Sequence, residues 1–428
     1  MTIENLHQIF LTSYSVCTDT RKVQKNDLFF ALKGENFNGN LFASEAIAKG
    51  ASYAIIDDEI YNTVDGCILV DNALSTLQQL AAFHRRYLNV KILALTGSNG
   101  KTTTKELLHT VLSKKFKTVV TSGNLNNHIG VPLTLLTMNN STEIGIVEMG
   151  ANHVKEIELL CNIVQPDYGY ITNFGKAHLE GFGGIQGVIE GKSELYHHLI
   201  TNNKLIFLNA NDDKQVEILK GYKSTFSFGF NPNNDAIINL VDVNPFVVSK
   251  FKSTVINSQL IGSYNFSNIS AALTIGNYFK INICSIKEAI EQFEPNSNRS
   301  QLISKRSNSI ILDAYNANPT SMKAALDNLI KMKTTNKIAI LGDMFELGQE
   351  AAVEHQIIVT QAEQLGFDQI YLAGVNFSQT EFDSSQTLCF SDYGALEKYL
   401  LSNPPKHGSI LIKGSRGMAL ERLLNTVF

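Results

Sequence analysis

The chain has 428 residues, 44% of them hydrophobic and 18% charged, and its formal net charge is -4 at pH 7. These values are typical of a globular protein of about two to four domains, and they exclude a disordered or low-complexity chain. They also argue against a nucleic-acid-binding surface, because the sequence contains no basic stripe or tail.

The N-terminus and the cysteines indicate a compartment. Residues 1–10 lack the basic flank and apolar core of a signal peptide, and no segment approaches the ~18 apolar residues of a membrane span. The five cysteines are scattered and form no C-x-x-C pair, which favours reduced thiols over a disulfide framework. We therefore expect a cytoplasmic protein without stable membrane association. A monomer is expected, although the sequence does not determine the oligomeric state.

Residues 1–88 are predicted to form a small α/β domain, with strands at 53–56 and 67–70 and a helix at 74–87. Its most distinctive stretch is Asp19-Thr20-Arg21, followed further along by Lys33. Arg21 and Lys33 carry the charge to hold an anion such as a diphosphate. A surface ion pair between Asp19 and Arg21 is the competing interpretation, and the residues alone favour it.

Residues 89–297 alternate between strands and helices, which predicts a parallel, doubly wound sheet with ligands at the carboxyl ends of its strands. Strands are expected at 91–95, 118–120, 144–148, 168–171, 204–208 and 225–228. Helices are expected at 102–114, 132–136, 154–160, 186–199, 214–219, 268–279 and 285–292. Residues 236–243 and 246–256 are expected to add an antiparallel pair at the edge of the sheet.

Residues 298–428 repeat the alternation and predict a Rossmann-like domain without a G-x-G-x-x-G motif. Its strands are expected at 310–313, 338–341, 370–373, 387–390 and 409–412, and its helices at 321–331, 351–365, 393–401 and 418–425. The polar stretch 294–298 predicts a hinge before this domain. The fold is therefore expected to be α/β with three domains, at residues 1–88, 89–297 and 298–428.

A glycine loop joins the first strand of the second domain to its first helix. The loop reads Gly97-Ser98-Asn99-Gly100-Lys101-Thr102-Thr103. Glycines let backbone N–H groups turn inward, Lys101 adds positive charge, and a threonine hydroxyl suits Mg²⁺. The first glycine of G-x-x-x-x-G-K-[ST] would fall at Leu95 and is missing. A plain connecting turn is the alternative, but the order of strand, loop, lysine and helix favours a nucleoside triphosphate site.

Three side chains beyond this loop suit the chemistry of a triphosphate. Glu148 ends a strand, where its carboxylate is well placed to ligate Mg²⁺. His178 follows the next strand, although Mg²⁺ prefers oxygen, and an ordinary loop histidine is the competing interpretation. Lys192 lies in a predicted helix, where a solvated lysine is the ordinary expectation.

Polar loops follow several other predicted strands. Asn126 and Asn127 precede a helix and are placed to contact a phosphate or carboxylate, with simple helix capping as the alternative. In the third domain, residues 313–319 and 413–418 follow strands in the same way. Both of these loops are candidates to face the nucleotide across an interdomain cleft.

Together these motifs resemble the Mur ligases of peptidoglycan synthesis, and the resemblance covers essentially the whole chain. The loop at 96–106, the stretch 148–151, the pair Ala177-His178 and the helix of Lys192 follow in the family's order. The family's ATP loop also lacks the first glycine. The stretches 123–132, 313–319, 341–348 and 413–418 resemble the family member that uses D-alanyl-D-alanine. Tyr264, within the stretch 262–268, stands where the family usually has histidine.

The resemblance implies roles for individual residues. The implied ATP-binding residues are Gly97, Ser98, Asn99, Gly100, Lys101, Thr102, Thr103, Asn268, Arg299 and Asp313. Two Mg²⁺ ions would be held by Thr102, Glu148, His178 and a carbamylated Lys192, and the implied catalytic residues are Lys101, Lys192, His178 and Glu148. The implied substrate-binding residues are Asp19, Thr20 and Arg21 for the uridine nucleotide, Asn126 and Asn127, and Asn316 and Asn318 for the incoming dipeptide.

The reaction implied by the resemblance is an ATP-dependent amide ligation. ATP would phosphorylate the terminal carboxylate of a UDP-N-acetylmuramoyl-tripeptide, and the amine of D-alanyl-D-alanine would displace phosphate from the acyl phosphate. A ligase like folylpolyglutamate synthase is one alternative, and the Asp19-Thr20-Arg21 domain argues against it. A nucleotide-switched binding protein is another, but the sequence contains no N-K-x-D-type loop to read guanine.

Overall fold

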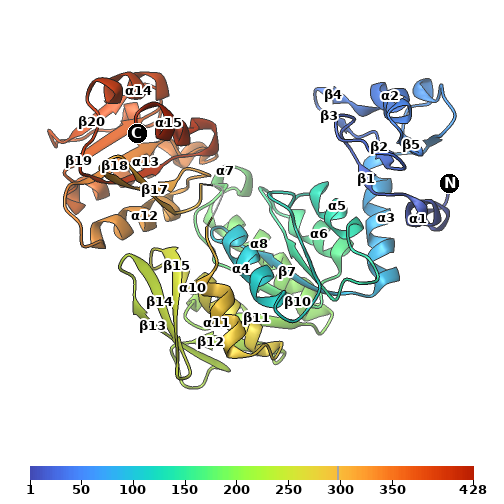
Figure 1. The fold of residues 1–428 in the computed structure, drawn as a ribbon, viewed down its shortest axis with the longest axis horizontal. Helices are drawn as coiled ribbons and strands as arrows, with labels where there is room; N and C mark the ends of the chain where they lie inside the picture. The colour runs from blue at the N-terminus through green and yellow to red at the C-terminus, as the bar shows by residue number, and fades with distance from the viewer. Residues whose placement is uncertain (296–297) are drawn as a thin grey trace.

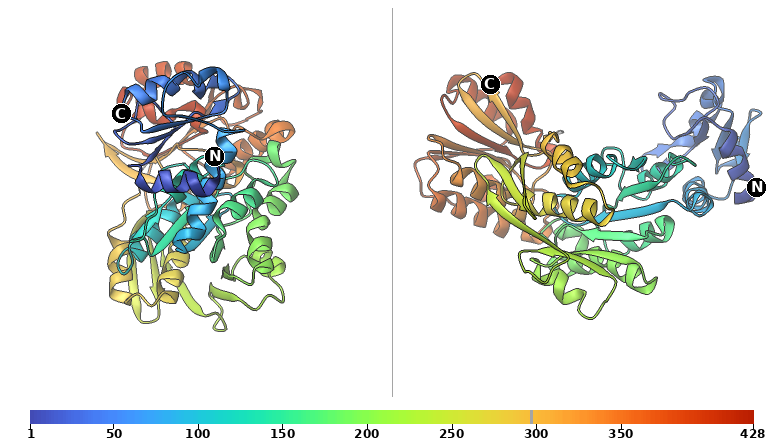
Figure 2. Two further views of the ribbon diagram at one scale, coloured as in Figure 1. Left: turned by 90° about the vertical axis from the view of Figure 1, so that its right-hand side faces the viewer. Right: turned by 60° about the horizontal axis from the view of Figure 1, so that its bottom comes forward.

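The structure, a computed structural model, describes residues 1–295 and 298–428 as three lobes that follow one another along the chain (Figure 1). The first and third lobes lie at opposite ends of the second, in Figure 1 and in the right-hand view of Figure 2. Each lobe is built on its own largely parallel sheet, so the predicted three-domain α/β fold is confirmed. Within the described residues, no helix has both the length and the apolar composition needed to cross a bilayer.

The first domain has a parallel sheet in the order β1-β2-β5-β6. Its elements are α1 (Ile3–Thr12), β1 (Val16–Cys17), β2 (Leu28–Phe30), β3 (Lys33–Gly34), β4 (Phe37–Asn38), α2 (Ala43–Ala48), β5 (Tyr53–Ile56), β6 (Cys67–Leu69) and α3 (Ala73–Leu88). β5, β6 and α3 lie where the sequence predicts them. β1 and β2 are two and three residues long, too short to show a period, and the sequence does not predict them.

The second domain forms, within the described residues, one sheet in the order β15-β14-β13-β12-β11-β10-β7-β9-β8. Its strands are β7 (Lys91–Thr96), β8 (Thr118–Val120), β9 (Ile144–Glu148), β10 (Tyr168–Ile171), β11 (Leu205–Asn209), β12 (Thr225–Gly229), β13 (Ala236–Asp242), β14 (Phe246–Phe251) and β15 (Thr254–Ile261). Its helices are α4 (Lys101–Leu112), α5 (Gly130–Leu136), α6 (Glu156–Val164), α7 (Leu179–Phe182), α8 (Ile185–Thr201), α9 (Asp213–Ile218), α10 (Asn265–Tyr278) and α11 (Ile283–Glu291). The strands from β7 to β12 confirm the predicted parallel alternation.

The antiparallel addition at the edge of this sheet differs from the prediction. Residues 246–256 are not one strand, because the chain reverses after β14 and returns as β15, which pairs with β14. Lys252 takes the left-handed conformation, with φ 55°, at this reversal. The edge therefore consists of three strands instead of two. The tight turn lies within a continuous stretch of β-forming residues, so the sequence pattern does not mark it.

The third domain has the sheet order β16-β17-β21-β18-β19-β20, in which only β16 is antiparallel to its neighbour among the described strands. Its elements are β16 (Gln301–Lys305), β17 (Asn308–Asp313), α12 (Pro319–Lys331), β18 (Lys337–Gly342), α13 (Ala351–Leu365), β19 (Gln369–Ala373), β20 (Thr387–Phe390), α14 (Tyr393–Ser402), β21 (Ser409–Lys413) and α15 (Leu423–Thr426). The helix predicted at 418–425 is wrong in its first half. Ala419 takes φ 48° and breaks that stretch into 3₁₀ turns, so that only α15 is α-helical.

The domain boundaries at 88/89 and 297/298 stay predictions. Part of the predicted hinge at 294–298, and the boundary beside it, fall on residues 296 and 297, which lie outside the described residues. At the other boundary, α3 packs against α1 of the first domain and also against α5 and α6 of the second. In Figure 1 this helix lies between the two lobes.

A buried ionic network joins the end of α3 to the central sheet. The guanidinium of Arg85, 8% exposed, donates to Asp167 Oδ2 at 3.0 Å and to the backbone carbonyl of Val164 at 2.9 Å. Asp167, immediately before β10, also accepts from Lys204 Nζ at 2.9 Å and from the Ile92 amide at 3.1 Å. Burial raises the pKa of the Asp167 carboxyl, but the hydrogen bonds from these donors and the Arg85 charge lower it by a larger amount. The net pKa of Asp167 is therefore below 3.8.

We expect Asp167→Ala to lower the free energy of unfolding at pH 7 by about 3–5 kcal/mol, because the Arg85 charge would be buried without its partner. Since the folded-state pKa of Asp167 is depressed, its stabilisation is present above the ordinary value of 3.8 and is lost as pH falls through the folded-state value. Urea unfolding at a series of pH values measures both effects. The exposed Asp65→Ala is the control, and equal midpoints for the two variants at pH 7 would contradict the expectation.

Candidate active site

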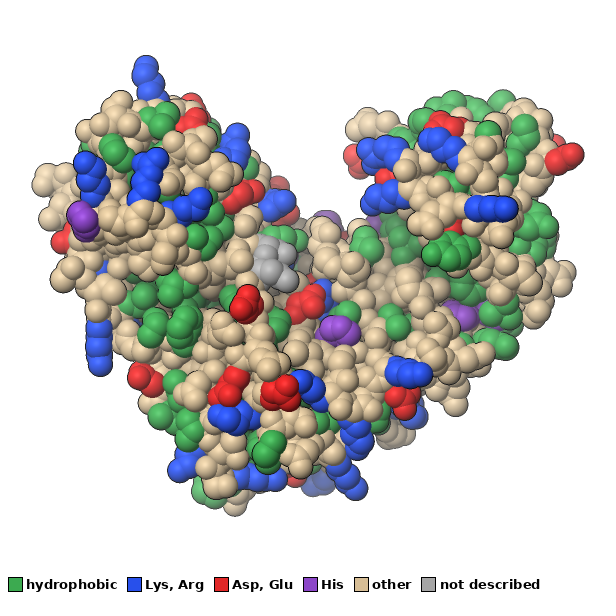
Figure 3. Space-filling model, viewed as in Figure 1, with side chains coloured by type: hydrophobic (Ala, Val, Ile, Leu, Met, Phe, Trp, Pro, Cys, Tyr) green, Lys and Arg blue, Asp and Glu red, His purple; other side chains and the backbone are tan. Residues whose placement is uncertain are grey.

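A cleft of about 580 Å³ lies between the second and third domains. It is lined by the glycine loop after β7, by the segments after β8, β9 and β10, and by the third-domain segments after β17, β18 and β21. The carboxyl ends of parallel strands from two sheets therefore face each other, as the sequence predicts. In Figure 3 the surface is deeply hollowed between the outer lobes, above the second domain.

The glycine loop has the backbone of a phosphate cradle. Gly100 takes φ 79°, and a Cβ atom there would lie 2.6 Å from Asn268 Oδ1. Lys101 begins α4, and its Nζ donates to the Gly97 carbonyl at 2.6 Å and to the Ser98 carbonyl at 3.2 Å. Burial lowers the pKa of Lys101 despite the opposing effect of the Glu148 charge. Its ammonium therefore lies on the loop, where it would neutralise a bound phosphate.

Glu148 points a buried carboxylate into this cleft. Its Oε1 accepts from Asn126 Nδ2 at 2.7 Å and from Thr102 Oγ1 at 3.3 Å. Its Oε2 is buried and has no hydrogen-bond partner among the described residues. Lys105 Nζ, fully buried, lies 3.9 Å from Oε2 and donates to the Thr121 carbonyl at 2.7 Å. One carboxylate oxygen is thus held by two hydrogen bonds, while the other, beside the Lys105 ammonium, accepts none among the described residues.

Lys192 is not the solvated lysine that its helix suggests. Its side chain is fully buried, and Nζ donates to the carbonyl of Ala151, a residue that lines the cleft, at 2.9 Å. The Phe182 ring covers Nζ, 4.8 Å from the ring centre. Burial, together with the Lys101 charge, moves the pKa of Lys192 well below 10.5. This shift favours the uncharged amine, which is the form that reacts with carbon dioxide to give a carbamate.

His178 lines the cleft and faces the third domain. It takes φ 53°, and its Nδ1 lies 2.5 Å from Oε2 of Glu346. Hydrogen bonding and the charge of His178 hold the pKa of Glu346 below its ordinary value despite burial. The sequence places His178 correctly at the cleft but gives no sign of this partner.

The donor set fits a magnesium ion that keeps its other ligands from substrate and water. The described residues contain no group of three or more His, Cys, Asp or Glu side chains able to hold a metal by themselves. The Glu148 carboxylate, whose Oε2 has no hydrogen-bond partner among the described residues, and the Thr102 hydroxyl, 3.3 Å from Oε1, would supply two oxygen ligands. Mg²⁺ commonly binds through one or two carboxylates plus phosphate oxygens and water, and these two side chains fit such an ion.

The side chains predicted to bind the nucleoside surround the same loop. Asn268, in α10, accepts from Thr104 Oγ1 at 3.0 Å and donates to Asn265 Oδ1 at 2.8 Å. The guanidinium of Arg299 stacks on Tyr315, 3.6 Å from the ring centre, and its buried Nε has no hydrogen-bond partner among the described residues. A guanidinium stacked on an aromatic ring offers a flat surface on which a purine can stack.

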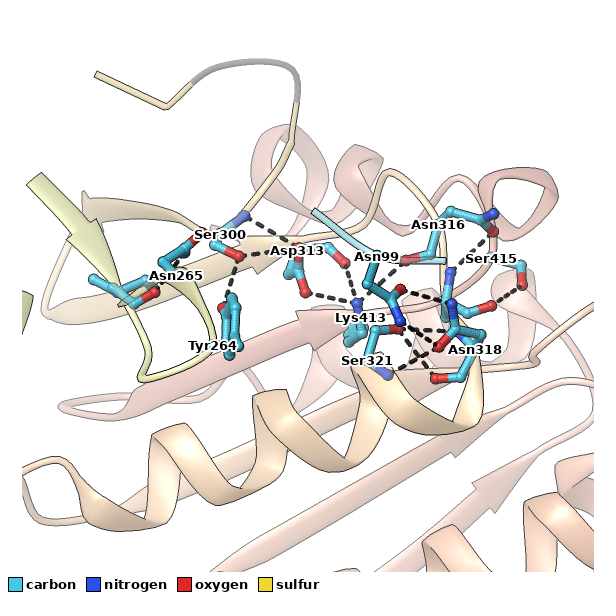
Figure 4. Close-up of polar contacts among 12 residues, drawn as sticks. Asn99, Tyr264, Asn265, Ser300, Asp313, Asn316, Asn318, Ser321, Lys413 and Ser415 are labelled. Carbon is cyan, nitrogen blue, oxygen red and sulfur yellow. Dashed lines mark hydrogen bonds and ion pairs between the residues drawn. The ribbon is translucent and has the colours of Figure 1, made fainter. Parts of the chain in front are cut away.

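Asp313 is the last residue of β17, and its carboxylate is held by an ion pair and by a backbone amide. Its Oδ2 accepts from Lys413 Nζ at 2.6 Å, and its Oδ1 accepts from the Ser300 amide at 3.1 Å (Figure 4). The Ser300 hydroxyl shares a hydrogen bond of 2.7 Å with Tyr264, the residue that replaces the family's usual histidine. Tyr264 therefore links the end of the second domain, through Ser300, to the Asp313 carboxylate of the third.

A reciprocal amide pair joins the glycine loop to the third domain. Asn318 Nδ2 donates to Asn99 Oδ1 at 2.8 Å, and Asn99 Nδ2 donates back to Asn318 Oδ1 at 3.4 Å (Figure 4). Asn318 also caps α12 by accepting from the Ser321 amide at 2.9 Å. Asn316 is exposed at the same loop, with its Oδ1 turned back to the amide of Ala317 at 2.9 Å.

The other two predicted substrate groups lie differently. Asn127 lines the cleft, but its Oδ1 accepts from the amides of Ile129 and Gly130 at the start of α5, which agrees with the alternative interpretation. Asp19 and Arg21 form an exposed bidentate ion pair in the first domain, which lowers the pKa of Asp19 to about 2. Thr20 beside them accepts from Lys49 through its backbone carbonyl. These three residues do not line the cleft between the second and third domains.

We expect Gly100→Ala to weaken ADP binding about tenfold or more, because a left-handed alanine is strained and its Cβ would displace Asn268. Isothermal titration with ADP measures the effect. Gly123→Ala is the matched control, since Gly123 also has positive φ, at 52°, but a Cβ there meets nothing within 4 Å. Equal losses in the two variants would show that strain, and not the Asn268 contact, sets the affinity.

Three family models together match nearly the whole chain. They are described as the Mur ligase family catalytic domain at residues 12–91, the Mur ligase middle domain at 95–276 and the Mur ligase glutamate ligase domain at 298–416. The chain is 34% identical to the UDP-N-acetylmuramoyl-tripeptide–D-alanyl-D-alanine ligase of Bacillus subtilis, over 96% of this chain and 92% of that protein. It is 32% identical to the Escherichia coli enzyme of that name, over 97% and 94%.

Solved structures agree with these relatives. A MurF crystal structure from Acinetobacter baumannii superposes with a TM-score of 0.88 at 30% identity, covering all of this chain and 98% of the other. MurF ligase from Thermotoga maritima, solved in complex with ADP, gives 0.84 at 27% identity, covering 98% and 97%. A folylpolyglutamate synthase from Mycobacterium tuberculosis, at 13% identity and 0.62, shares the fold alone. The resemblance read from the sequence is confirmed: the chain belongs to the Mur ligase family.

Proposed function

We propose that this protein is an ATP-dependent amide ligase that joins D-alanyl-D-alanine to UDP-N-acetylmuramoyl-tripeptide and releases ADP and phosphate, in cytoplasmic synthesis of the peptidoglycan precursor. The observation that carries the proposal is the single cleft in which the glycine loop meets the polar loop of residues 313–318, joined by Asn99 and Asn318. The names of the full-length relatives support the two substrates. The ADP complex of a solved relative supports the use of ATP.

The first requirement of the reaction is that the negative charges of the reactants are neutralised. The terminal carboxylate of the tripeptide attacks the γ-phosphate of ATP, so two anions must approach each other as ADP leaves. Lys101, whose Nζ donates to the Gly97 carbonyl of the glycine loop, is proposed to neutralise the phosphates. The free amine of the dipeptide then attacks the carbonyl carbon of the acyl phosphate, and the tetrahedral intermediate collapses with loss of phosphate and a proton.

Thr102, Glu148, His178 and a carbamylated Lys192 are the residues proposed to hold Mg²⁺, with two ions in the complete site. When bound, Mg²⁺ supplies positive charge to the triphosphate and to the acyl phosphate. The unpartnered Glu148 oxygen supports the first part of this set. The burial of the Lys192 amine and its lowered pKa support carbamylation, which would turn a side chain with no affinity for cations into a carboxylate ligand.

Each domain is proposed to contribute one substrate. Residues 1–88 would bind the UDP-muramoyl peptide, with Asp19, Thr20 and Arg21 at the uridine nucleotide, residues 89–297 would bind ATP, and residues 298–428 would bind the dipeptide. Asn316 supports the last assignment because its exposed amide stands at the cleft beside the glycine loop. Asn126 donates a hydrogen bond to Glu148, and it is proposed to contact the substrate beside the metal site.

The proposed function predicts that rapid phosphate release needs both peptide substrates. We expect full turnover only with ATP, a UDP-N-acetylmuramoyl-tripeptide and D-alanyl-D-alanine together, with the ligated pentapeptide detected by mass spectrometry. Lys101→Ala should lower the rate about a hundredfold or more with an unchanged melting temperature, because a charge facing the transition state is lost. Fast ATP hydrolysis without either peptide would instead support the nucleotide-switched alternative.

Carbamylation of Lys192 makes a separate prediction. We expect Lys192→Ala to be inactive and to regain part of its activity with added short-chain carboxylic acids, which would replace the missing carbamate oxygens. Incubation with ¹³C-bicarbonate should give a carbamate carbon signal by NMR in the wild type and not in Lys192→Ala. Lys155→Ala is the control, since its side chain is 77% exposed. A wild-type enzyme that is active without the carbamate signal would contradict the modification.

A further inference from the structure

Tyr264 has no part in the reaction as described so far, although it lines the cleft. It immediately precedes α10, and its ring lies against the backbone of Gly262. Gly262 takes φ 84°, and a Cβ atom at this position would clash with the Tyr264 ring. The glycine therefore leaves the space that the ring occupies, and the hydroxyl at the end of the ring reaches the third domain (Figure 4).

In the third domain, the pairing of β16 with β17 brings Ser300 beside Asp313. The register places Gln301 opposite Leu312, and Ser300 and Asp313 are the next residues outward in this antiparallel pair. The Ser300 amide and hydroxyl donate to Asp313 Oδ1 at 3.1 and 3.3 Å, while Lys413 Nζ donates to Oδ2 at 2.6 Å. Both oxygens of the carboxylate are thereby held.

The hydroxyls of Tyr264 and Ser300 have one consistent direction of donation. An ionised carboxylate only accepts, so the Ser300 hydroxyl donates to Asp313 and is left to accept from the Tyr264 hydroxyl, 2.7 Å away. Burial and the Asp313 charge raise the pKa of Tyr264, against the effect of its hydrogen bond with Ser300, and so keep the phenol protonated at neutral pH. The hydrogen bonds therefore run from Tyr264 through Ser300 to Asp313.

The start of α10 contacts both edges of the cleft. Asn268 lies four positions after Tyr264, so the two side chains share one face of the helix. Asn268 accepts from Thr104 Oγ1 at 3.0 Å, in the helix that follows the glycine loop. Tyr264 reaches Ser300 in the third domain. One helical turn thus connects the glycine-loop side of the cleft with the carboxylate on the other side.

We propose that Tyr264 is a positioning residue: its hydroxyl, acting through Ser300, sets the orientation of the Asp313 carboxylate toward the bound nucleotide. The inference rests on the proposed function for the nucleotide, and it adds a residue that the implied ATP-binding set does not contain. Tyr264 belongs to the second domain, whereas Ser300 and Asp313 belong to the third. The Asp313 carboxylate is then tied to the second domain by hydrogen-bonded side chains as well as by the covalent chain.

Tyr264→Phe tests this role, because it removes only the hydroxyl and keeps the ring beside Gly262. We expect the full-length variant to bind ADP about three- to tenfold more weakly than the wild type by isothermal titration, which is the loss typical of one hydrogen bond. Tyr222→Phe is the matched control. The Tyr222 hydroxyl donates to the Lys204 carbonyl at 2.5 Å in the same domain, but Tyr222 is not among the described residues that line the cleft. This control should bind ADP as the wild type does, whatever its melting temperature.

Ser300→Ala separates positioning from packing. It removes the middle of the hydrogen-bonded chain and should weaken ADP binding at least as much as Tyr264→Phe does. In the double variant we expect an affinity within about twofold of that of Ser300→Ala alone, because the Tyr264 hydroxyl acts on Asp313 only through Ser300. A role of the Tyr264 hydroxyl in packing or folding would instead give losses that multiply.

Three results would overturn the proposal: wild-type affinity in Tyr264→Phe, an equal loss in Tyr222→Phe, or multiplied losses in the double variant. All of these measurements use ADP alone and need neither peptide. An enzyme that shows the expected pattern with ADP but does not join the two peptides would reject the proposed function and leave the positioning role standing.

Discussion

The structure depends on holding several negative charges together at the meeting point of two domains. A triphosphate and a carboxylate must share the cleft, and the protein adds its own carboxylates, Glu148 and Asp313, to the same space. Each of these has a cation within reach: Lys105 lies 3.9 Å from Glu148 and Lys413 lies 2.6 Å from Asp313. Both lysines are buried, so their charges are only weakly screened by water.

This balance explains why the cleft is built from strand ends and loops. Parallel strands bring their carboxyl ends to one edge of a sheet, where backbone amides and short polar side chains are free to contact ligands. The second domain offers the glycine loop and Glu148 in this way, and the third offers Asp313 and Lys413. The two edges meet through the pair Asn99 and Asn318 and through Lys176, whose Nζ lies 2.5 Å from the buried Glu354.

What the sequence predicts well is what is local. The glycine loop, the strand that ends in Glu148 and the alternation of strands and helices are all set by neighbours in the chain, and the structure places them as expected. The break in the last helix at Ala419 and the reversal at Lys252 depend on left-handed residues that are neither glycine nor asparagine, so no residue type marks them.

What it predicts poorly depends on distant partners. The burial of Lys192 comes from Phe182 and Ala151, and a helical lysine carries no sign of it. Asn99 and Asn318 are 219 positions apart, and Glu346 meets His178 across the domain interface. The family resemblance implies which of these side chains bind ligands. It does not indicate which other side chains contact them. The contacts of Lys105 with Glu148 and of Glu346 with His178 have no separate signal in the sequence. The only indication is that both are charged residues inside motifs that resemble those of the family.

The position of α3 has a mechanical consequence. Its last turn is anchored to the central sheet by Arg85, while its other contacts reach α5 and α6 of the second domain as well as α1 of the first. The helix therefore belongs, as a rigid body, as much to the second lobe as to the first, although the chain enters the second domain only after it. If the first lobe rotates while the Arg85 anchor stays intact, the contacts that change are those between α3 and the rest of the first domain. The helix itself then stays fixed to the second domain as the axis of the rotation, and the chain does not bend within it.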